Sequence, residues 1–191
     1  MKVIGLTGNY GNSKEECTTY LMADSAILYT GRPFFIPDFA QRFEAAPSIV
    51  VRTGRLGKAI APKFAHRYWD AFTAGFTVKA CQESDERMAG LERAFDGAAM
   101  VGTWVPVAVS DDALHTVVEF KVDGNVVSRC CLDDMLLPLH DALSSVSWRC
   151  SIKMGDLLFT GDAGDRFVLT PGMRLTATVA GKDVMDVKVR R

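Results

Sequence analysis

The sequence lacks long apolar runs and blocks of like charge. Its 191 residues include 22 Lys and Arg and 23 Asp and Glu, which gives a formal net charge of -1. A chain with so little net charge has no excess of positive charge to bind nucleic acid or an anionic membrane surface, so we expect neither as a partner. The longest apolar stretches, residues 98–101 and 104–109, are far shorter than the roughly 20 residues that span a bilayer. The sequence therefore predicts no transmembrane helix.

Signals for secretion, disulfide bonds and structural zinc are also missing. The apolar run at residues 3–6 is too short for a signal-peptide core, so we expect a cytoplasmic location. The five cysteines are scattered, odd in number and without a Cys-x-x-Cys pair, which argues against a disulfide framework and a zinc site. His66, His115 and His140 share no short metal-ligand spacing, and a structural role is favoured for each.

The chain does contain enough apolar material for one substantial core. Hydrophobic residues make up 48% of the sequence and charged residues 24%. A domain of this size buries roughly 70% of the surface of its unfolded chain. We predict a single domain over residues 1–191, in which residues 1–35 form a loop and helix annexe packed on the rest.

The hydrophobic pattern favours strands over helices. Strands are predicted at residues 3–6, 34–37, 49–51, 100–101, 104–107 and 156–161, and hairpins at 116–127 and 174–189. Helices are predicted from Ser13 and at residues 62–72, 83–93 and 132–148, the third as a surface helix or connection. Phe64, Tyr68 and Phe72 would share one helical stripe, and Pro138 would bend or divide the last helix. Without regular βαβ alternation, this pattern indicates an α+β, mainly β fold.

Few side chains have an obvious chemistry. The glycine-rich loop after residues 3–6 matches neither the dinucleotide-binding fingerprint nor the Walker pattern. The acidic pairs at 111–112 and 133–134 could ligate magnesium, but such pairs are more typical of protein surfaces and helix N-termini. The vicinal thiols of Cys130 and Cys131, beside Arg129, are a weaker candidate for a redox or soft-metal site.

The last third of the chain carries a specific pattern. Residues 152–162 read Ile-Lys-Met-Gly-Asp-Leu-Leu-Phe-Thr-Gly-Asp, and Gly-Met-Arg-Leu follows at 172–175. This region resembles the fumarylacetoacetate hydrolase family, in which a Lys-Pro-Gly-Asp turn precedes a strand ending Phe-Thr-Gly-Thr-Pro and then a Gly-x-x-Leu strand. Met154 stands where the family has that proline, and Asp162-Ala163 stand where it has the last Thr-Pro.

Three further segments match the family in the same order along the chain. Gly8-Asn9-Tyr10 resembles its Gly-Arg-Asn-Tyr loop, Asp24-Ser25-Ala26 its Lys-Pro-Asp-Ser-Ala segment, and residues 93–96 its Lys-Gly-Phe-Asp motif. The resemblance implies a mixed β-roll or sandwich, usually found as a homodimer. It also implies hydrolysis, decarboxylation or isomerisation of small oxo-acids around Mg²⁺ or Mn²⁺.

The positions that the resemblance assigns to metal ligands have lost their carboxylates. The family's Glu-x-Glu pair falls on Ala46 and Ser48, and its third ligand, an Asp, falls on Gly75 or Thr77. A hard divalent cation prefers oxygen ligands that include carboxylates. We therefore expect metal binding at the family site to be lost, and we expect no cofactor.

The family's acid–base pair is also changed. Its histidine falls on Ser13, whereas the glutamate three residues later remains as Glu16, and its lysine falls on Arg93. A serine cannot exchange protons near neutral pH as an imidazole does. The resemblance leaves Glu16 and Arg93 as candidate catalytic residues, although a capping box explains Glu16 and a solvated helix end explains Arg93 equally well. The candidate substrate-binding residues by resemblance are Tyr10, Asp24, Thr160 and Gly161.

Two functional hypotheses remain open at this point. In the first, the chain is a catalytically degenerate family member with a binding or regulatory role, acting as a homodimer or as a heteromer with an active paralogue. In the second, it is a metal-independent hydrolase, decarboxylase or isomerase of a small oxo-acid. Arg93 would then hold the carboxylate, Glu16 would transfer the proton, and the loop at residues 160–161 would donate hydrogen bonds.

Overall fold

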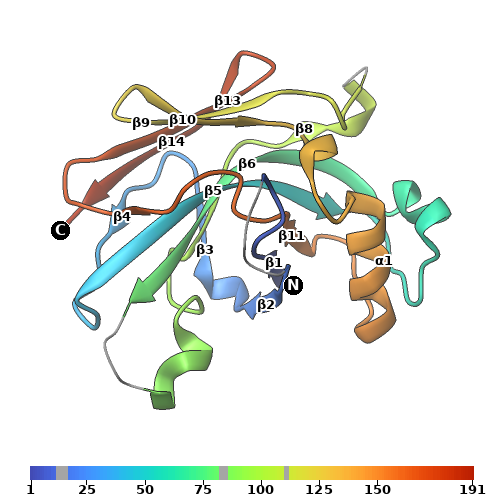
Figure 1. The fold of residues 1–191 in the computed structure, drawn as a ribbon, viewed down its shortest axis with the longest axis horizontal. Coiled ribbons are helices and arrows are strands. Elements are labelled where there is room, and N and C mark those ends of the chain that lie inside the picture. Colours follow the sequence, from blue (N-terminus) through green and yellow to red (C-terminus); the bar gives the residue numbers. More distant parts are fainter. Residues whose placement is uncertain (12–16, 82–85, 110–111) are drawn as a thin grey trace.

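The computed structural model describes residues 1–11, 17–81, 86–109 and 112–191. Most of the regular structure is β, in two sheets, with one α-helix and several short 3₁₀ helices. Figure 1 shows the smaller sheet, which contains β9, β10, β13 and β14, lying across the long strands β5 and β6, with α1 to one side. The predicted α+β, mainly β class is therefore confirmed.

The larger sheet is built around the two longest neighbouring strands, β5 and β6. Its hydrogen-bonded order is β2-β1-β11-β5-β6-β7-β3, with β12 added to β5 and β8 added to β6. Because core residues cover both faces of β5, the middle of this strand, residues 45–51, is continuously buried and is apolar apart from Ser48. The strands are β1 (Val3–Leu6), β2 (Thr19–Met22), β3 (Ile27–Tyr29), β5 (Arg42–Thr53), β6 (Trp69–Cys81), β7 (Ala99–Val101), β8 (Val105–Pro106), β11 (Leu157–Phe159) and β12 (Phe167–Val168).

The smaller sheet has the order β10-β9-β13-β14-β4. Its strands are β4 (Phe34–Phe35), β9 (Val118–Val122), β10 (Asn125–Cys130), β13 (Arg174–Val179) and β14 (Lys182–Arg190). Both predicted hairpins are confirmed, and each turn places a non-glycine residue and then a glycine at positive φ: Asp123 (51°) with Gly124 (83°), and Ala180 (49°) with Gly181 (77°). Such pairs of positive φ angles match the twist of the flanking strands.

The main core lies between the two sheets, and a second core lies on the far face of the larger sheet. Ile49 belongs to the main core and its neighbour Val50 to the second, as the alternation of a strand requires. Phe76 of β6 meets Phe120 of β9 edge to face, with ring centroids 5.6 Å apart. This aromatic contact joins the sheets at the centre of the main core.

The predicted helix over residues 62–72 is wrong in its second half. A 3₁₀ helix, η2 (Pro62–Arg67), begins at the proline as expected, but the chain then enters β6 at Trp69. Phe72 pairs with Val51 of β5 as part of the longest ladder in the fold. Long-range pairing with β5 thus overrides the helical spacing of the aromatic residues.

The other helices follow the sequence more closely. Pro138 divides the predicted helix at 132–148 into η5 (Leu132–Asp134) and α1 (Leu139–Arg149), because proline cannot donate a helical hydrogen bond. The remaining short helices are η1 (Asp24–Ala26), η3 (Glu86–Leu91) and η4 (Val107–Val109). The start of the short helix predicted from Ser13 lies outside the described residues, as do residues 83–85 of the predicted 83–93 helix. None of the helices in the described part of the chain is long and apolar enough to cross a membrane.

The described part of residues 1–35 enters both sheets. Strand β1 pairs with β11 in parallel and with β2 antiparallel, while β3 pairs with β7. Strand β4 joins the edge of the smaller sheet through β14. The N-terminal segment therefore supplies the edge of the larger sheet, where β11 separates β1 and β2 from the central strands.

Candidate functional site

The positions that the resemblance assigns to metal ligands lie together on the β5–β6 pair. Ala46 is paired with Thr77, and Ser48 is paired with Gly75. Residues two apart on a strand, and residues directly opposite on its partner, share one face of the sheet. Ala46, Ser48 and Thr77 are all at least 98% buried. The family register thus identifies one buried locus, but no position in it carries a carboxylate.

The same locus has no room for the missing third carboxylate. A Cβ atom at Gly75 would lie 2.5 Å from the Met100 carbonyl oxygen and 2.5 Å from Val50 Cγ2. The Ser48 hydroxyl donates to the Ile49 carbonyl at 3.3 Å. Among the described residues, no group of three or more His, Cys, Asp or Glu side chains could hold a metal ion. The donor set therefore does not fit the Mg²⁺ or Mn²⁺ of active family members.

Tyr20 of β2 reaches into this region across Gly5 of β1. The two residues are paired on adjacent strands, and a Cβ atom at Gly5 would overlap the tyrosine ring. Glycine is therefore required at position 5, because only a bare backbone lets the ring lie flat across β1. The phenol then comes close to Thr77 and Asp162, which both act on its pKa.

Three buried polar atoms in this region have no hydrogen-bond partner within the described residues: Tyr20 Oη, Thr77 Oγ1 and Asp162 Oδ1. The Thr77 hydroxyl is near enough to favour the ionised phenol, but the two hydroxyls do not meet at hydrogen-bond geometry. Each unsatisfied buried polar group costs about 1–3 kcal/mol. Native proteins rarely keep such groups without a ligand, ion or water to satisfy them.

Arg93 supplies a buried positive charge beside these atoms. Its side chain is 8% exposed, and its guanidinium lies 4.6 Å from the centroid of the Tyr20 ring. Glu92 Oε1 is 3.9 Å from Arg93 Nε, and Glu92 Oε2 is 3.2 Å from Lys79 Nζ. Burial raises the pKa of the Tyr20 phenol, and the charge of Arg93 opposes that rise.

Asp162 is held by an arginine through only one of its oxygens. Its Oδ2 accepts from Arg166 Nε at 2.9 Å and from Nη2 at 2.5 Å, whereas Oδ1 is buried without a partner. We call Tyr20, Thr77, Arg93 and Asp162 the buried cluster. It combines two hydroxyls and a guanidinium that can donate with one carboxylate oxygen that can accept.

Tyr10 and Thr160, predicted to bind substrate, use their polar groups within the protein. Tyr10 Oη lies 2.8 Å from Thr160 Oγ1, which in turn donates to the Ile49 carbonyl at 2.9 Å. Asn9 Nδ2 donates to the Thr160 carbonyl at 2.8 Å. Burial raises the pKa of Tyr10 well above its ordinary value. These bonds fasten the N-terminal loop to the end of β11.

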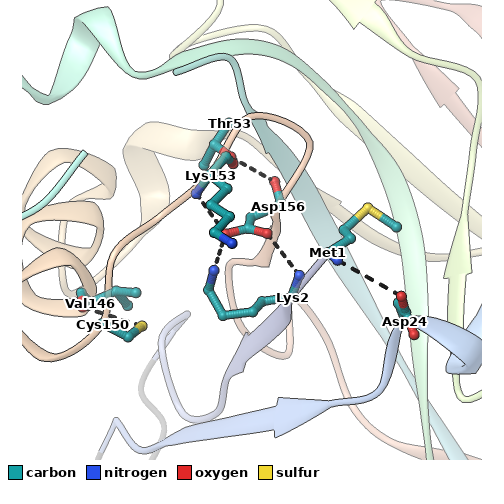
Figure 2. Close-up of polar contacts among 8 residues, drawn as sticks. All are labelled: Met1, Lys2, Asp24, Thr53, Val146, Cys150, Lys153 and Asp156. Carbon is teal, nitrogen blue, oxygen red and sulfur yellow. Dashed lines mark hydrogen bonds and ion pairs between the residues drawn. The ribbon is translucent and has the colours of Figure 1, made fainter. Parts of the chain in front are cut away.

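The remaining predicted site residues lie in different settings. Gly161 has φ of 132°, and a Cβ atom there would lie 2.7 Å from Asn9 Cβ, so the glycine allows the close approach of that loop. Asp24 is exposed and lies 3.8 Å from the Met1 amine, as Figure 2 shows. Glu16 lies outside the described residues, so its predicted role stays a prediction.

Asp156, at the start of β11, is the best-satisfied buried carboxylate near the site. Its Oδ1 accepts from the Lys2 amide at 2.7 Å, and its Oδ2 accepts from the Lys153 amide at 2.8 Å and from Lys2 Nζ (Figure 2). Burial raises the pKa of this carboxyl, but the hydrogen bonds outweigh burial and leave the pKa lowered. Asp156 thus ties β1 to the turn before β11.

The vicinal thiols gain no support as a reactive pair. Burial raises the pKa of Cys130 to about 12, and burial also raises the pKa of Cys131. A reactive cysteine needs a stabilised thiolate. Both thiols are held in the neutral form that reacts slowly.

A groove of about 860 Å³ opens beside the buried cluster, between the β1–β2 hairpin, residues 90–93 and α1. Tyr20 and Arg93 are among its lining residues. Ile4 and Leu21, which also line it, lie on the opposite face of the β1–β2 pair from the Tyr20 ring. Sequence reasoning placed Arg93 here through the family motif but missed Tyr20, whose role depends on the bare backbone of Gly5. It noted Asp162 only as a departure from the family's Thr-Pro.

Comparison with known families agrees with the motifs and the fold. The family model described as fumarylacetoacetate (FAA) hydrolase C-terminal matches residues 7–190. The chain belongs to the fumarylacetoacetate hydrolase family. The match covers the four residues of the buried cluster and Asp156, whereas Ile4 and Leu6 of the groove precede it.

Curated relatives are distant in sequence. Oxaloacetate tautomerase fahd-1, mitochondrial, of Caenorhabditis elegans is 22% identical over 142 residues, which cover 72% of this chain and 66% of that protein. An uncharacterised protein of Pyrococcus horikoshii is 21% identical over 201 residues, which cover 98% of this chain and 87% of that protein. The chain thus spans just under two thirds of the first relative and most of the second.

Solved structures of fumarylacetoacetate hydrolase family proteins share the whole fold. Fumarylpyruvate hydrolase from Pseudomonas aeruginosa, in complex with Mn²⁺ and pyruvate, superposes with a TM-score of 0.87 at 19% identity, over 100% of this chain and 89% of that one. For 5-carboxymethyl-2-hydroxymuconate delta-isomerase from Mycobacterium smegmatis, the TM-score is 0.85 at 22% identity, over 100% and 78% of the two chains. The predicted family fold is therefore confirmed.

Proposed function

We propose that this chain binds a small oxo-acid without a divalent metal, as a binding or regulatory member of the family that has lost the metal-dependent chemistry. One observation carries the proposal. The predicted locus of the lost metal ligands adjoins a buried guanidinium, from Arg93, and two buried hydroxyls, from Tyr20 and Thr77, that have no partner among the described residues. A bound carboxylate would accept from both hydroxyls and offset the charge of Arg93.

The acceptor in the cluster also suits such a ligand. Asp162 Oδ1 is buried and has no donor in the part of the chain that the structure describes, while Oδ2 of the same carboxylate accepts from Arg166. An oxo-acid in its enol form, or the related hydroxy-acid, carries a hydroxyl beside the carboxylate and could donate to Oδ1. The cluster therefore matches a ligand with an anionic end and a neighbouring hydroxyl.

Calorimetric titration with pyruvate and oxaloacetate in the presence of EDTA tests the proposal. The wild-type chain should bind at least one of them, and Arg93→Met should weaken binding by about tenfold or more because a charge-assisted hydrogen bond is lost. Thr77→Val should weaken it by about fivefold. Arg190→Met, which removes an exposed arginine of β14, is the matched control and should bind as the wild type does.

A second titration, with Mn²⁺, tests whether the chain has lost the metal binding of the family. Titration with Mn²⁺ alone should leave the melting temperature unchanged, because a ligand that binds only the folded chain would raise it. Saturable Mn²⁺ binding at one site, or oxo-acid binding that appears only with Mn²⁺ present, would overturn the proposal.

The metal-independent enzyme remains the second candidate, favoured by the buried position of Arg93 beside the Tyr20 phenol. In that case Arg93 holds the carboxylate and Glu16 transfers a proton during decarboxylation, isomerisation or hydrolysis. Its test is turnover of oxo-acids in EDTA. Activity that Glu16→Gln leaves intact would remove the proposed base, and no detectable turnover would remove the candidate.

The assembly and location of the chain also remain proposals. A homodimer is expected for members of this family, and a heteromer with an active paralogue would suit a regulatory role. Light scattering of the purified chain, alone and mixed with such a paralogue, distinguishes these states. A cytoplasmic location stays a prediction from the sequence.

A further inference from the structure

Three large apolar side chains are strongly exposed at one place in the fold. Met154, Leu56 and Trp148 are 76%, 71% and 64% exposed, the highest values among the large hydrophobic residues of the described chain. None of the three lines the groove beside the buried cluster. Exposed apolar residues scattered singly are common, whereas several in one place mark an interaction surface. Whether these three belong to one surface therefore decides their significance.

Backbone pairing brings Leu56 and Met154 together. Gly57 and Ile152 exchange two backbone hydrogen bonds, of 3.0 and 2.9 Å, in an isolated antiparallel bridge. Because the pairing is antiparallel, residues just before Gly57 lie beside residues just after Ile152, and the two backbones are about 5 Å apart. Leu56 immediately precedes Gly57, and Met154 follows Ile152 by two residues. The two exposed side chains therefore come from adjoining stretches of backbone.

The last turn of α1 carries Trp148 and lies against the same loop. The Ala59 amide donates to the Ser147 carbonyl at 3.0 Å, and Lys58 Nζ donates to the Arg149 carbonyl at 3.3 Å. Trp148 stands between these two acceptors, just before the helix ends. It therefore joins the other two apolar side chains in one region of the surface.

The charged side chains of these segments are all basic. Residues 54–59 and 147–154 contain no Asp or Glu, and each of their Arg and Lys residues is exposed. We call the following seven residues the basic apolar patch: Leu56, Trp148 and Met154, with Arg55, Lys58, Arg149 and Lys153.

Acidic residues near the patch are already paired or stand apart from it. Asp156 is buried and bonded within the chain, and Asp70 pairs with Arg52 at 2.8 Å. Asp141 of α1 lies about two helical turns, roughly 10 Å, before Trp148. The patch therefore presents a local excess of positive charge, although the chain as a whole has a formal net charge of -1.

Charge and size together favour an anionic lipid surface over a protein partner. A second copy of this chain would bring the same four cations face to face across a twofold interface, which is unfavourable. A specific protein interface uses roughly 20–30 residues on each side, many more than the patch contains. A bilayer needs no such area, because each apolar side chain gains by entering it and each cation is attracted to the anionic headgroups. Tryptophan is also enriched at the membrane interface.

We infer that the basic apolar patch binds the surface of an anionic membrane. Leu56, Trp148 and Met154 enter the boundary between headgroups and acyl chains, and the four cations contact the anionic headgroups. The net charge of the whole chain predicts no such partner, but the fold gathers the cations of residues 54–59 and 147–154 onto one surface. This surface is separate from the buried cluster, so the inference does not depend on the proposed function.

Flotation with phosphatidylcholine vesicles, with and without phosphatidylserine, tests the inference. The chain should bind the vesicles that contain phosphatidylserine at least about fivefold more tightly, and added salt should weaken this binding. Vesicles should also shift the tryptophan emission to shorter wavelength. Trp148→Phe should remove most of this shift while the chain still binds, because Trp148 is far more exposed than the 8% exposed Trp69.

Two variants and two matched controls locate the contact. Trp148→Ser should weaken vesicle binding about tenfold, because a large apolar side chain is lost. Arg55→Gln combined with Lys153→Gln should weaken it about twentyfold. Phe35→Ser and Arg190→Gln change an aromatic residue that is 57% exposed and its exposed neighbour on β14, and both should bind as the wild type does. Thermal unfolding should be the same for all of these chains, since the substituted side chains are exposed.

Several outcomes would overturn the inference. Equal binding to neutral and anionic vesicles would do so, as would binding to neither. Wild-type affinity in Trp148→Ser and in the double variant would show that another surface binds lipid. Self-association in light scattering that Trp148→Ser abolishes, without vesicle binding, would assign the patch to a second copy. Retention on immobilised polyglutamate without vesicle binding would assign it to an acidic protein. Oxo-acid binding, measured separately, stands or falls independently of each of these results.

Discussion

Two aspartates, Asp156 and Asp162, lie on either side of the short strand β11 and differ in the hydrogen bonds of their carboxylates. Asp156 comes just before the strand, and both of its carboxylate oxygens accept hydrogen bonds, from Lys2 and Lys153. Asp162 follows the strand, and one of its oxygens is buried without a donor in the described part of the chain. Only the first aspartate has the complete set of contacts expected of a purely structural residue.

The difference separates buried polar groups whose hydrogen bonds are complete within the described residues from those that lack a partner there. An unsatisfied buried oxygen destabilises the folded chain, so it is expected where another molecule completes the set. The two tyrosines repeat the contrast, since Tyr10 Oη meets Thr160 Oγ1 whereas Tyr20 Oη has no partner among the described residues. The hydrogen bonds around Asp156 and Tyr10 hold the N-terminal segment, and the buried cluster is where we propose that a ligand binds.

The largest expected effect is at Asp156. Asp156→Asn should lower the free energy of unfolding at pH 7 by about 3 kcal/mol, because a buried and fully bonded carboxylate loses its charge and one of its acceptors. Urea unfolding measures this loss. Asp24→Asn, which removes an exposed carboxylate paired with the Met1 amine, is the control and should change stability by less than about 0.5 kcal/mol.

The same variant has a defined pH dependence. Because the pKa of Asp156 is lowered from its ordinary value of 3.8, its contribution is fully present above that value and disappears as the pH falls through the lowered pKa. The difference in unfolding free energy between the wild type and Asp156→Asn should therefore shrink in acid. A difference that stays constant down to the acid transition would contradict the assignment.

The second largest effect concerns Gly75 of β6, which is two residues from Thr77 and has no room for a side chain. Gly75→Ala should destabilise the chain by about 2 kcal/mol, since the added methyl group would press on the Met100 carbonyl and Val50. Gly90→Ala, where a Cβ atom would meet nothing within 4 Å, should be neutral or slightly stabilising. Equal effects of the two substitutions on thermal unfolding would mean that position 75 has room for a side chain.

The smallest effect on stability, and the sharpest test of the contrast, comes from the two tyrosines. Tyr10→Phe should cost about 1 kcal/mol because it leaves Thr160 with one fewer partner, whereas Tyr20→Phe should cost nothing measurable. For oxo-acid binding the order should reverse, with affinity lowered only by Tyr20→Phe. Equal stability losses in the two variants would indicate that the Tyr20 phenol has a structural partner.

Much of the fold could be predicted because its signals are local. The turns at Asp123 and Gly124 and at residues 180–181 carry their own conformational preferences, and Pro138 ends a helix wherever it stands. The helix predicted through Phe72 failed because pairing with β5 is a long-range interaction that spacing along the sequence does not report. The family register names residues that lie opposite each other on β5 and β6, Ser48 and Gly75, and their assignment as the family's ligand positions stays a prediction.

The sequence by itself determined the family and the mainly β fold, because these depend on residue identity in a fixed order. Only the tertiary structure decided which polar groups are satisfied. Tyr10 and Tyr20 are both buried phenols, and the sequence does not separate them. Whether a buried hydroxyl finds a partner depends on packing between segments up to 150 residues apart, and that packing leaves the Tyr20 hydroxyl without a partner among the described residues.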